Sequence, residues 1–128
     1  MFSKKERSTF PYWFAHWCAF NLTALNLKVW KFKYLFHDIE KPWLMLLWKD
    51  YPKVQQWHRK HNRHHLEYGG NKGYDYDSMI IDWECSRLTK AESPMTAREE
   101  AIRLLQTRPE YQEILNNEIV PRLNSLGL

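Results

Sequence analysis

Residues 11–29 read PYWFAHWCAFNLTALNLKV, and this stretch decides the fold class. Its apolar side chains recur every three or four residues, which is the period of one face of an α-helix. They are Trp13, Trp17, Phe20, Ala24 and Leu27. Pro11 suits the first turn, because the amide at that position has no helical partner. The sequence therefore predicts a helix over residues 11–29 with this apolar row as its core face.

The same region contains no charged residue between positions 8 and 27, a length that could cross a bilayer. However, it is diluted by polar residues, namely Pro11, His16, Asn21, Thr23 and Asn26. It also lacks the small-residue cleavage site of a secretory signal peptide. We therefore expect a buried helix, and no membrane partner.

Helical spacing continues after this helix, whereas strand-like alternation is scarce. We expect a helix over residues 31–39 with Phe32, Leu35 and Phe36 facing inward. A short helix over residues 42–48 is almost entirely apolar, so it should be buried in the core or in a homodimer interface. A further helix is expected over residues 52–67, ending at the glycine-rich segment 68–73.

The second half of the chain also reads as helical. A helix over residues 75–90 should bury Met79, Ile80, Trp83 and Leu88. Thr96 and Glu99 have the spacing of a capping box that starts the next helix. Pro109 should start a last helix, which Pro121 ends or kinks. The prediction is one all-α domain over residues 1–128 with six or seven helices, a site within residues 10–90, and C-terminal helices over 95–126.

Composition limits the class of protein. The chain has 128 residues, of which 16% are aromatic, so it is long enough for one core and is not disordered. Residues 1–91 carry 15 Lys and Arg against 9 Asp and Glu, and such a basic region attracts phosphates, nucleotides or nucleic acid. Two cysteines are too few for a disulfide framework, which favours a reducing, cytoplasmic location.

All six histidines fall between positions 16 and 65. His37 and Asp38 are adjacent, and imidazole with carboxylate is a good ligand set for first-row metals. On the expected helix over 52–67, His61 and His65 would share a face. His58 and His65 would lie about 10 Å apart, so either they serve two different ions or one of them is not a ligand. Asp82 stands among apolar residues, where a carboxylate is costly unless it is paired or ligating. These residues predict a metal site.

The order of these residues resembles the HD superfamily of metal-dependent phosphohydrolases, which is all-helical. The residues that carry the resemblance are His16, His37-Asp38, His58, His64-His65 and Asp82. The segment His37-Asp38-Ile39-Glu40-Lys41 is similar to the HDxxK form of the family motif. The chain also looks like short, uncharacterised HD-like proteins of phages and bacteria, which carry an H…N-x-HH motif and a later acidic residue followed by Trp. Asp75 replaces the Pro expected after Gly-Tyr in the HD-GYP branch, so cyclic dinucleotide cleavage is not implied.

The resemblance implies hydrolysis of a nucleotide or other small phosphoester by a metal-activated water. His16, His37, Asp38 and Asp82 would hold a first ion, and Asp38 would bridge to a second held by His58 with His64 or His65. Mn, Fe, Zn, Co and Mg are the candidate ions. Lys41, with Arg59 or Arg63, would bind the phosphoryl oxygens. A remaining histidine such as His61 would protonate the leaving oxygen.

Three alternatives remain open on the sequence. Some HD proteins are di-iron oxygenases that use the same ligands. A non-enzymatic helical protein could bind nucleic acid or a protein partner through the basic residues 59–65. The metal could also stabilise the fold without turnover. Trp57 and Tyr68 flank the histidine-rich segment and could line a pocket that stacks a base or a sugar.

Overall fold

Helices form all the regular elements in the computed structural model, which describes residues 2–3, 5–90 and 94–128. The longer helices are α1 (Phe10–Asn26), α2 (Glu40–Trp48), α3 (Tyr51–His61), α4 (Tyr76–Ser86) and α5 (Ala97–Thr107). A last helical stretch combines η3 (Pro109–Tyr111), α6 (Gln112–Ile114), η4 (Leu115–Ile119) and α7 (Val120–Ser125). Two short 3₁₀ turns are η1 (Lys5–Ser8) and η2 (Phe32–Phe36). The all-α prediction is therefore confirmed.

Helix α1 starts where the sequence predicts and buries a neighbouring face. The Thr9 side chain accepts a hydrogen bond from the Tyr12 amide, and Pro11 lies in the first turn. Phe20 and Ala24 are buried as expected, but Trp13, Trp17 and Leu27 are only half-buried. Their places in the interior are taken by other side chains of the helix, namely Tyr12, His16, Ala19 and Asn21. The helix ends at Asn26, before Lys28, whose φ of 61° lies in the left-handed region.

The predicted burial of the next two segments in the core of the chain is wrong, whereas a homodimer interface at residues 42–48 stays a prediction. In η2 the buried side chain is Tyr34, whereas Phe32, Leu35 and Phe36 are exposed. Helix α2 contains no buried residue. It lies along the outside of α3, and Trp43, Leu46 and Leu47 project away from the core. Because residues 42–48 are almost uniformly apolar, their sequence has no periodicity that would show which face of the helix is buried.

Helix α3 is shorter than predicted. The Asp50 side chain accepts from the Lys53 amide at its start, and the helix ends at His61. Asn62 has an extended backbone, with φ −113° and ψ 129°. Residues 62–75 form a looped segment that carries His64 and His65. The expected sharing of a helical face by His61 and His65 is therefore wrong.

The C-terminal helices follow the predicted boundary signals. Asp75 caps α4, in which Met79 and Ile80 are buried while Trp83 is half-buried and Leu88, after the helix, is exposed. Thr96 and Glu99 form the predicted capping box at the start of α5. Pro121 does not end the last stretch, because it lies in the first turn of α7. The wider turn η4 precedes Pro121, because the proline ring lacks an amide hydrogen and crowds the carbonyl one turn earlier.

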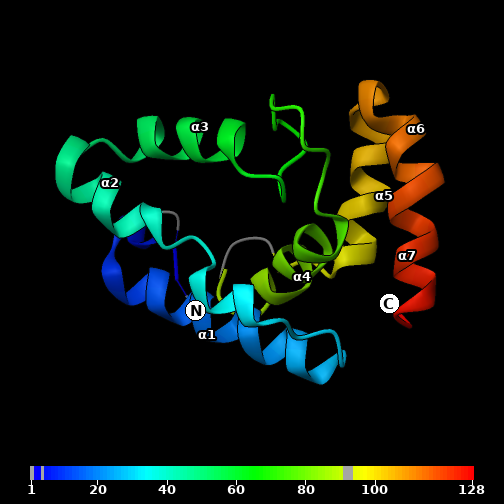
Figure 1. Ribbon diagram of the computed structural model, residues 1–128, viewed down its shortest axis with the longest axis horizontal. Coiled ribbons are helices and arrows are strands. Elements are labelled where there is room, and N and C mark those ends of the chain that lie inside the picture. The colour runs from blue at the N-terminus through cyan, green and yellow to red at the C-terminus, as the bar shows by residue number, and fades with distance from the viewer. Residues whose placement is uncertain (1, 4, 91–93) are drawn as a thin grey trace.

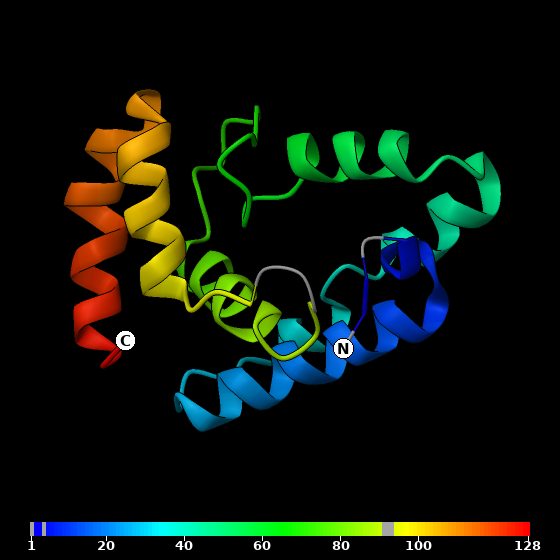
Figure 2. The same ribbon diagram turned by 180° about the vertical axis from the view of Figure 1, so that it is seen from behind.

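Two hydrophobic clusters hold the helices together. One joins α1, η2 and α4 through Ala19, Phe20, Ala24, Tyr34, Ile81 and Cys85. The other joins α4 to the C-terminal helices, with Met79 and Ile80 packed against residues of α5, η4 and α7. Both ribbon views show α4 between α1 and the C-terminal pair, while α2 and α3 lie across from α1 (Figure 1, Figure 2). Within the described residues, no helix has the length and apolar character needed to cross a bilayer.

Candidate metal centre

Five parts of the fold supply polar side chains to one buried cluster. His16 comes from α1, the His37-Asp38 pair from the link between η2 and α2, and His58 from α3. His64 and His65 come from the looped segment, and Asp82 comes from α4. All of these residues except His65 and Asp82 are buried, and those two are partly buried. The cluster thus collects residues separated by up to 66 positions in the chain.

The first group consists of His16, His37, Asp38 and Asp82, whose ligand atoms lie within 4.8 Å of one another. His16 Nε2 is 2.9 Å from Asp82 Oδ1 and 3.5 Å from Asp38 Oδ2. His37 Nε2 is 3.4 Å from Asp82 Oδ1 and 3.3 Å from Asp38 Oδ2. Two imidazole nitrogens and two carboxylate oxygens thus face the same small volume.

The second group consists of His58, His64 and His65, and it meets the other oxygen of Asp38. Asp38 Oδ1 is 3.1 Å from His58 Nε2 and 3.2 Å from His64 Nε2. The expectation that His58 and His65 lie too far apart for one ion is wrong, because the chain leaves the helix at His61 and turns back. The Oδ1 and Oδ2 atoms of Asp38 therefore face different groups of histidines.

Several atoms of this cluster are buried and lack a hydrogen-bond partner among the described residues. They are Asp38 Oδ1, Asp82 Oδ1, His58 Nε2, His64 Nε2 and His65 Nε2. Burying such atoms unpaired is costly, whereas coordination would satisfy them together. Nitrogen and carboxylate donors match the preferences of first-row divalent ions. The cluster fits a divalent metal centre.

The backbone at Asp38 explains how two adjacent residues reach one site. His37 follows the last turn of η2 with φ −59° and ψ 126°, and Asp38 has φ 55°, in the left-handed region. Two neighbours within a helix would diverge by about 100°. The Trp13 indole donates a hydrogen bond of 2.9 Å to the Asp38 carbonyl and thereby holds this unusual conformation.

A second carboxylate, that of Glu40, contacts His58, and the ligand atoms of Asp38, Glu40 and His58 lie within 4.8 Å of one another. His58 Nδ1 pairs with Glu40 Oε1, and Asn62 Nδ2 donates to the same oxygen at 3.1 Å. A carboxylate partner keeps the proton on Nδ1, which leaves the Nε2 lone pair directed at Asp38. Neither residue is predicted from the sequence to have this role, although Glu40 lies in the HDxxK-like segment. Glu40 lies two residues after Asp38 and Asn62 four after His58, but this spacing alone does not indicate a contact between them.

The pKa values indicate which groups hold protons in the metal-free cluster. Burial lowers the pKa of His37 to about 4 and that of His65 to about 2, so both are neutral at pH 7. Burial would raise the pKa of Asp38, but His37, Lys41 and His58 hold it well below its usual range. Burial opposes protonation of His16 and His58, yet their acidic neighbours raise both pKa values. The carboxylates are ionised and ready to bind a cation.

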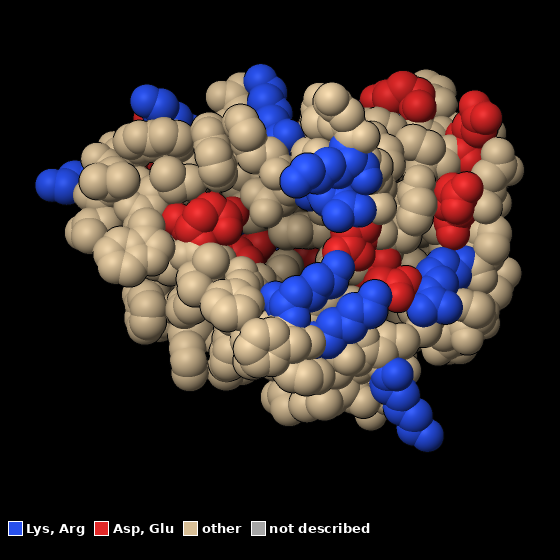
Figure 3. All heavy atoms as spheres, viewed as in Figure 1, with Lys and Arg blue, Asp and Glu red and all other residues tan. Residues whose placement is uncertain are grey.

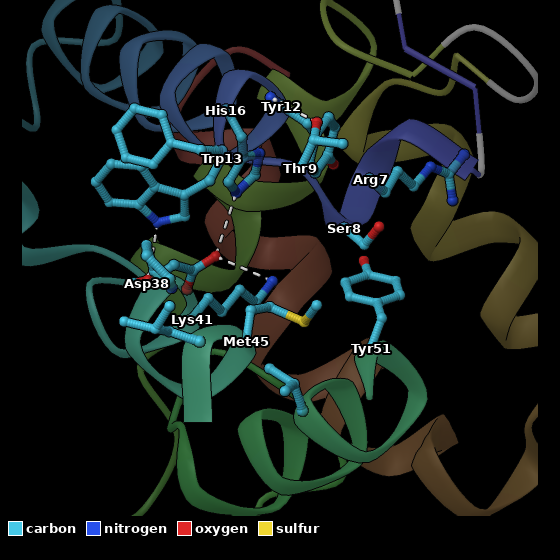
Figure 4. A pocket seen from close by; sticks show the side chains of 14 residues that line it. Arg7, Ser8, Thr9, Tyr12, Trp13, His16, Asp38, Lys41, Met45 and Tyr51 are labelled. Atoms are coloured by element: carbon cyan, nitrogen blue, oxygen red, sulfur yellow. Dashed lines mark hydrogen bonds and ion pairs between the residues drawn. The ribbon is translucent and has the colours of Figure 1, made fainter. Parts of the chain in front are cut away.

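A pocket of about 300 Å³ opens beside the first group (Figure 4). His16 and Asp38 line its inner end. Lys41 extends along it, with Nζ 3.4 Å from Asp38 Oδ2 (Figure 4). Burial would lower the pKa of Lys41, but Asp38 raises it above the ordinary value, so the ammonium stays charged. The pocket gives a small molecule a route to the cluster.

Three other predicted site residues lie elsewhere. His61 is exposed, donates from Nδ1 to the Trp57 carbonyl and stacks on the Trp57 ring. Arg59 is exposed on α3. Arg63 donates to the Gly73 carbonyl at 2.8 Å and so braces the looped segment. The structure brings together seven of the predicted residues with Lys41 and leaves these three outside the pocket.

Comparisons of this chain with known protein families, characterised proteins and solved structures found no match. On the face shown in Figure 3, Lys and Arg side chains are interspersed with Asp and Glu and form no continuous basic surface. Lys33 with Asp75 and Arg122 with Asp77 are ion pairs of this kind.

Proposed function

We propose that the protein is a metal-dependent phosphohydrolase acting on a nucleotide or another small phosphoester. The observation that carries the proposal is the Asp38 carboxylate, whose oxygens face two separate groups of histidines beside a pocket that also holds Lys41. The order of these residues resembles that of HD phosphohydrolases, which supports the same reaction. When bound, divalent cations would supply a water acidic enough to attack near neutral pH.

The residues of the chain divide the work of hydrolysis. His16, His37, Asp38 and Asp82 would hold one cation, and Asp38 with His58, His64 and His65 would hold the other. Hydrolysis transfers the phosphoryl group from the ester oxygen to water, and the alcohol leaves with a proton. Lys41 would place its charge beside the phosphoryl oxygens, where negative charge grows as the ester bond breaks. To donate a proton, His61 would have to contact the leaving oxygen of the substrate. His61 is exposed and lies outside the pocket, so it does not have this contact.

The test is an assay of phosphate release. The purified protein is loaded with Mn²⁺, Co²⁺ or Mg²⁺ and given a panel of nucleotides and small phosphoesters. We expect Asp38→Asn to lower kcat by at least about 10³-fold, because the shared ligand is lost. Asp50→Asn is the matched control, since Asn caps a helix as well as Asp and this residue lies outside the pocket. Full activity in Asp38→Asn would sink the proposal.

The same experiment separates the oxygenase alternative. Copurified iron with oxygen uptake on an added organic substrate, and no phosphate release, would replace hydrolysis with oxidation. Iron alone does not decide, because both reactions can use it.

A further inference from the structure

The pocket beside the metal centre combines an ionic inner end with apolar walls. Its inner end holds His16, Asp38 and Lys41. Its walls are formed by Phe10, Trp13, Pro42, Met45, Leu46 and Val54. Resting on the proposed function, we propose that the substrate is a small phosphomonoester whose organic group is apolar, an alkyl or aryl phosphate. The phosphate would lie at Lys41 and the organic group against the apolar walls.

The mouth of the pocket leaves large apolar side chains uncovered. Phe10 is 63% exposed and Leu46 is 66% exposed, although both line the pocket. Phe10 also contacts the Trp13 ring, at 5.4 Å between centroids, so the wall is continuous from the mouth to the residue that holds Asp38. Covering such surface gains about 25 cal/mol for each Å² removed from water. An apolar ligand group would make that gain, and a hydrated one would not.

Two hydroxyl groups near the outer end are engaged with the backbone, whereas Arg7 Nε is buried there without a partner among the described residues. The Thr9 hydroxyl donates to the Glu6 carbonyl at 2.6 Å, and the Ser8 hydroxyl donates to the Lys5 carbonyl at 3.3 Å. Tyr51 points its hydroxyl toward Ser8 (Figure 4). A sugar needs several free donors and acceptors to replace its hydration. This end of the pocket therefore favours an apolar group over a ribose.

Size and charge restrict the phosphate end. A volume of about 300 Å³ is at the lower limit for ligand pockets, so the ligand is small. The cationic side chains that line it are Arg7 and Lys41. A nucleoside triphosphate would bring three phosphates into this space. A monophosphate is matched by Lys41 together with the metal centre, since Arg7 lies on the side of the pocket away from Lys41 (Figure 4).

Binding can be measured without turnover by using n-alkylphosphonates, which have no ester bond to hydrolyse. We expect calorimetry on the Mn²⁺-loaded protein, freed of excess metal, to show Kd falling about fourfold per added methylene from methyl to butyl. Leu46→Asn should weaken butylphosphonate binding by about fivefold and leave methylphosphonate binding unchanged. Leu47→Asn is the matched control, because Leu47 is the next residue of α2, is 74% exposed and does not line the pocket.

The outcomes separate this inference from the function on which it rests. A Kd that is independent of chain length, with phosphate release from other esters, overturns the inference and leaves the phosphohydrolase intact. A chain-length dependence abolished only by Leu46→Asn, without phosphate release from any nucleotide or small phosphoester, supports the apolar pocket and overturns the function. Equal effects of Leu46→Asn and Leu47→Asn would also overturn the inference, since the tail would then not lie in this pocket.

Discussion

Asp38 is a buried carboxylate on a left-handed backbone, and its two oxygens contact histidines from different parts of the chain. Such a residue is costly to fold, because both the backbone conformation and the burial of charge are unfavourable. The cost is offset by Trp13, which holds the carbonyl, and by Lys41, which lies 3.4 Å from the carboxylate. A bound cation would offset it further. The local strain is thus located at the residue that the proposed chemistry needs most.

Glu40 should control how strongly His58 binds a metal. Its carboxylate accepts from His58 Nδ1 and from Asn62, which fixes the tautomer that offers Nε2 to the cluster. We expect Glu40→Gln to weaken the affinity for Mn²⁺ by about 10- to 100-fold. The affinity can be measured by competition with a fluorescent chelator. Glu67→Gln, at an exposed position outside the cluster, is the control. Equal Mn²⁺ affinities in the two variants would show that Glu40 does not control metal binding by His58.

The sequence predicted which residues form the cluster, but it did not predict the contacts that hold these residues in place. His16, His37-Asp38 and Asp82 have unusual neighbours in the sequence, and each could be picked out as chemically costly. Glu40 could not, because a glutamate at a helix start is most often solvated. The bond from the Trp13 indole to the Asp38 carbonyl spans 25 residues and has no local signature.

The end of α3 at His61 is the element that completes the cluster. A longer helix would separate His58 from His65 by about 10 Å. The chain instead turns at Asn62, and Arg63 with the Asp75 amide ties both ends of the looped segment. The sequence favoured a longer helix, because residues 62–67 contain good helix formers and the first glycine comes only at position 69. Tertiary contacts to Asp38 decided the outcome, and these are invisible in a local pattern.

The start of α5 offers a separate test of the fold. The Thr96 side chain accepts from the Glu99 amide at 3.2 Å, and Glu99 accepts from the Thr96 amide in return. We expect Thr96→Ala to lower the free energy of unfolding by about 1 kcal/mol, because an amide at the helix start loses its partner. Urea denaturation measures this loss. Thr107→Ala, at the other end of the helix, should change stability by less than about 0.5 kcal/mol. Equal free energies of unfolding in the two variants would show that the capping box does not stabilise the fold.

The His/Asp cluster lies beside two hydrophobic clusters, and α4 contributes residues to both of them. Asp82 lies on α4 between Ile81, which packs toward α1, and Cys85, which packs in the same cluster. The sequence predicted the helical class and the capping signals because these depend on local periodicity. It could not predict the outward position of α2, because a segment of uniform hydropathy has no preferred face. The exposed α2 side chains became informative only when the pocket beside them was known.

Metal binding should release protons at neutral pH. Burial opposes protonation, but in the metal-free protein Cys85, Asp38 and Asp82 raise the pKa of His16 above its ordinary value. Asp38 likewise raises the pKa of His58. These histidines therefore keep part of their protons at pH 7, and a cation must displace them. We expect the affinity for Mn²⁺ to rise between pH 6 and pH 8, with proton uptake by the buffer measurable in calorimetry. An affinity that is constant over this range would contradict the assignment of both histidines as ligands.

Measuring the metal content of the protein tests whether the cluster around Asp38 binds divalent cations. Elemental analysis after equilibration with Mn²⁺ and removal of free metal should find about two ions per wild-type chain, because Asp38 faces two groups of ligands. Asp38→Asn should retain fewer than one, while Asp50→Asn should match the wild type. Two results would contradict a metal centre at Asp38. One is a metal content no higher than background in the folded wild-type protein, and the other is the same metal content in the wild type and in Asp38→Asn.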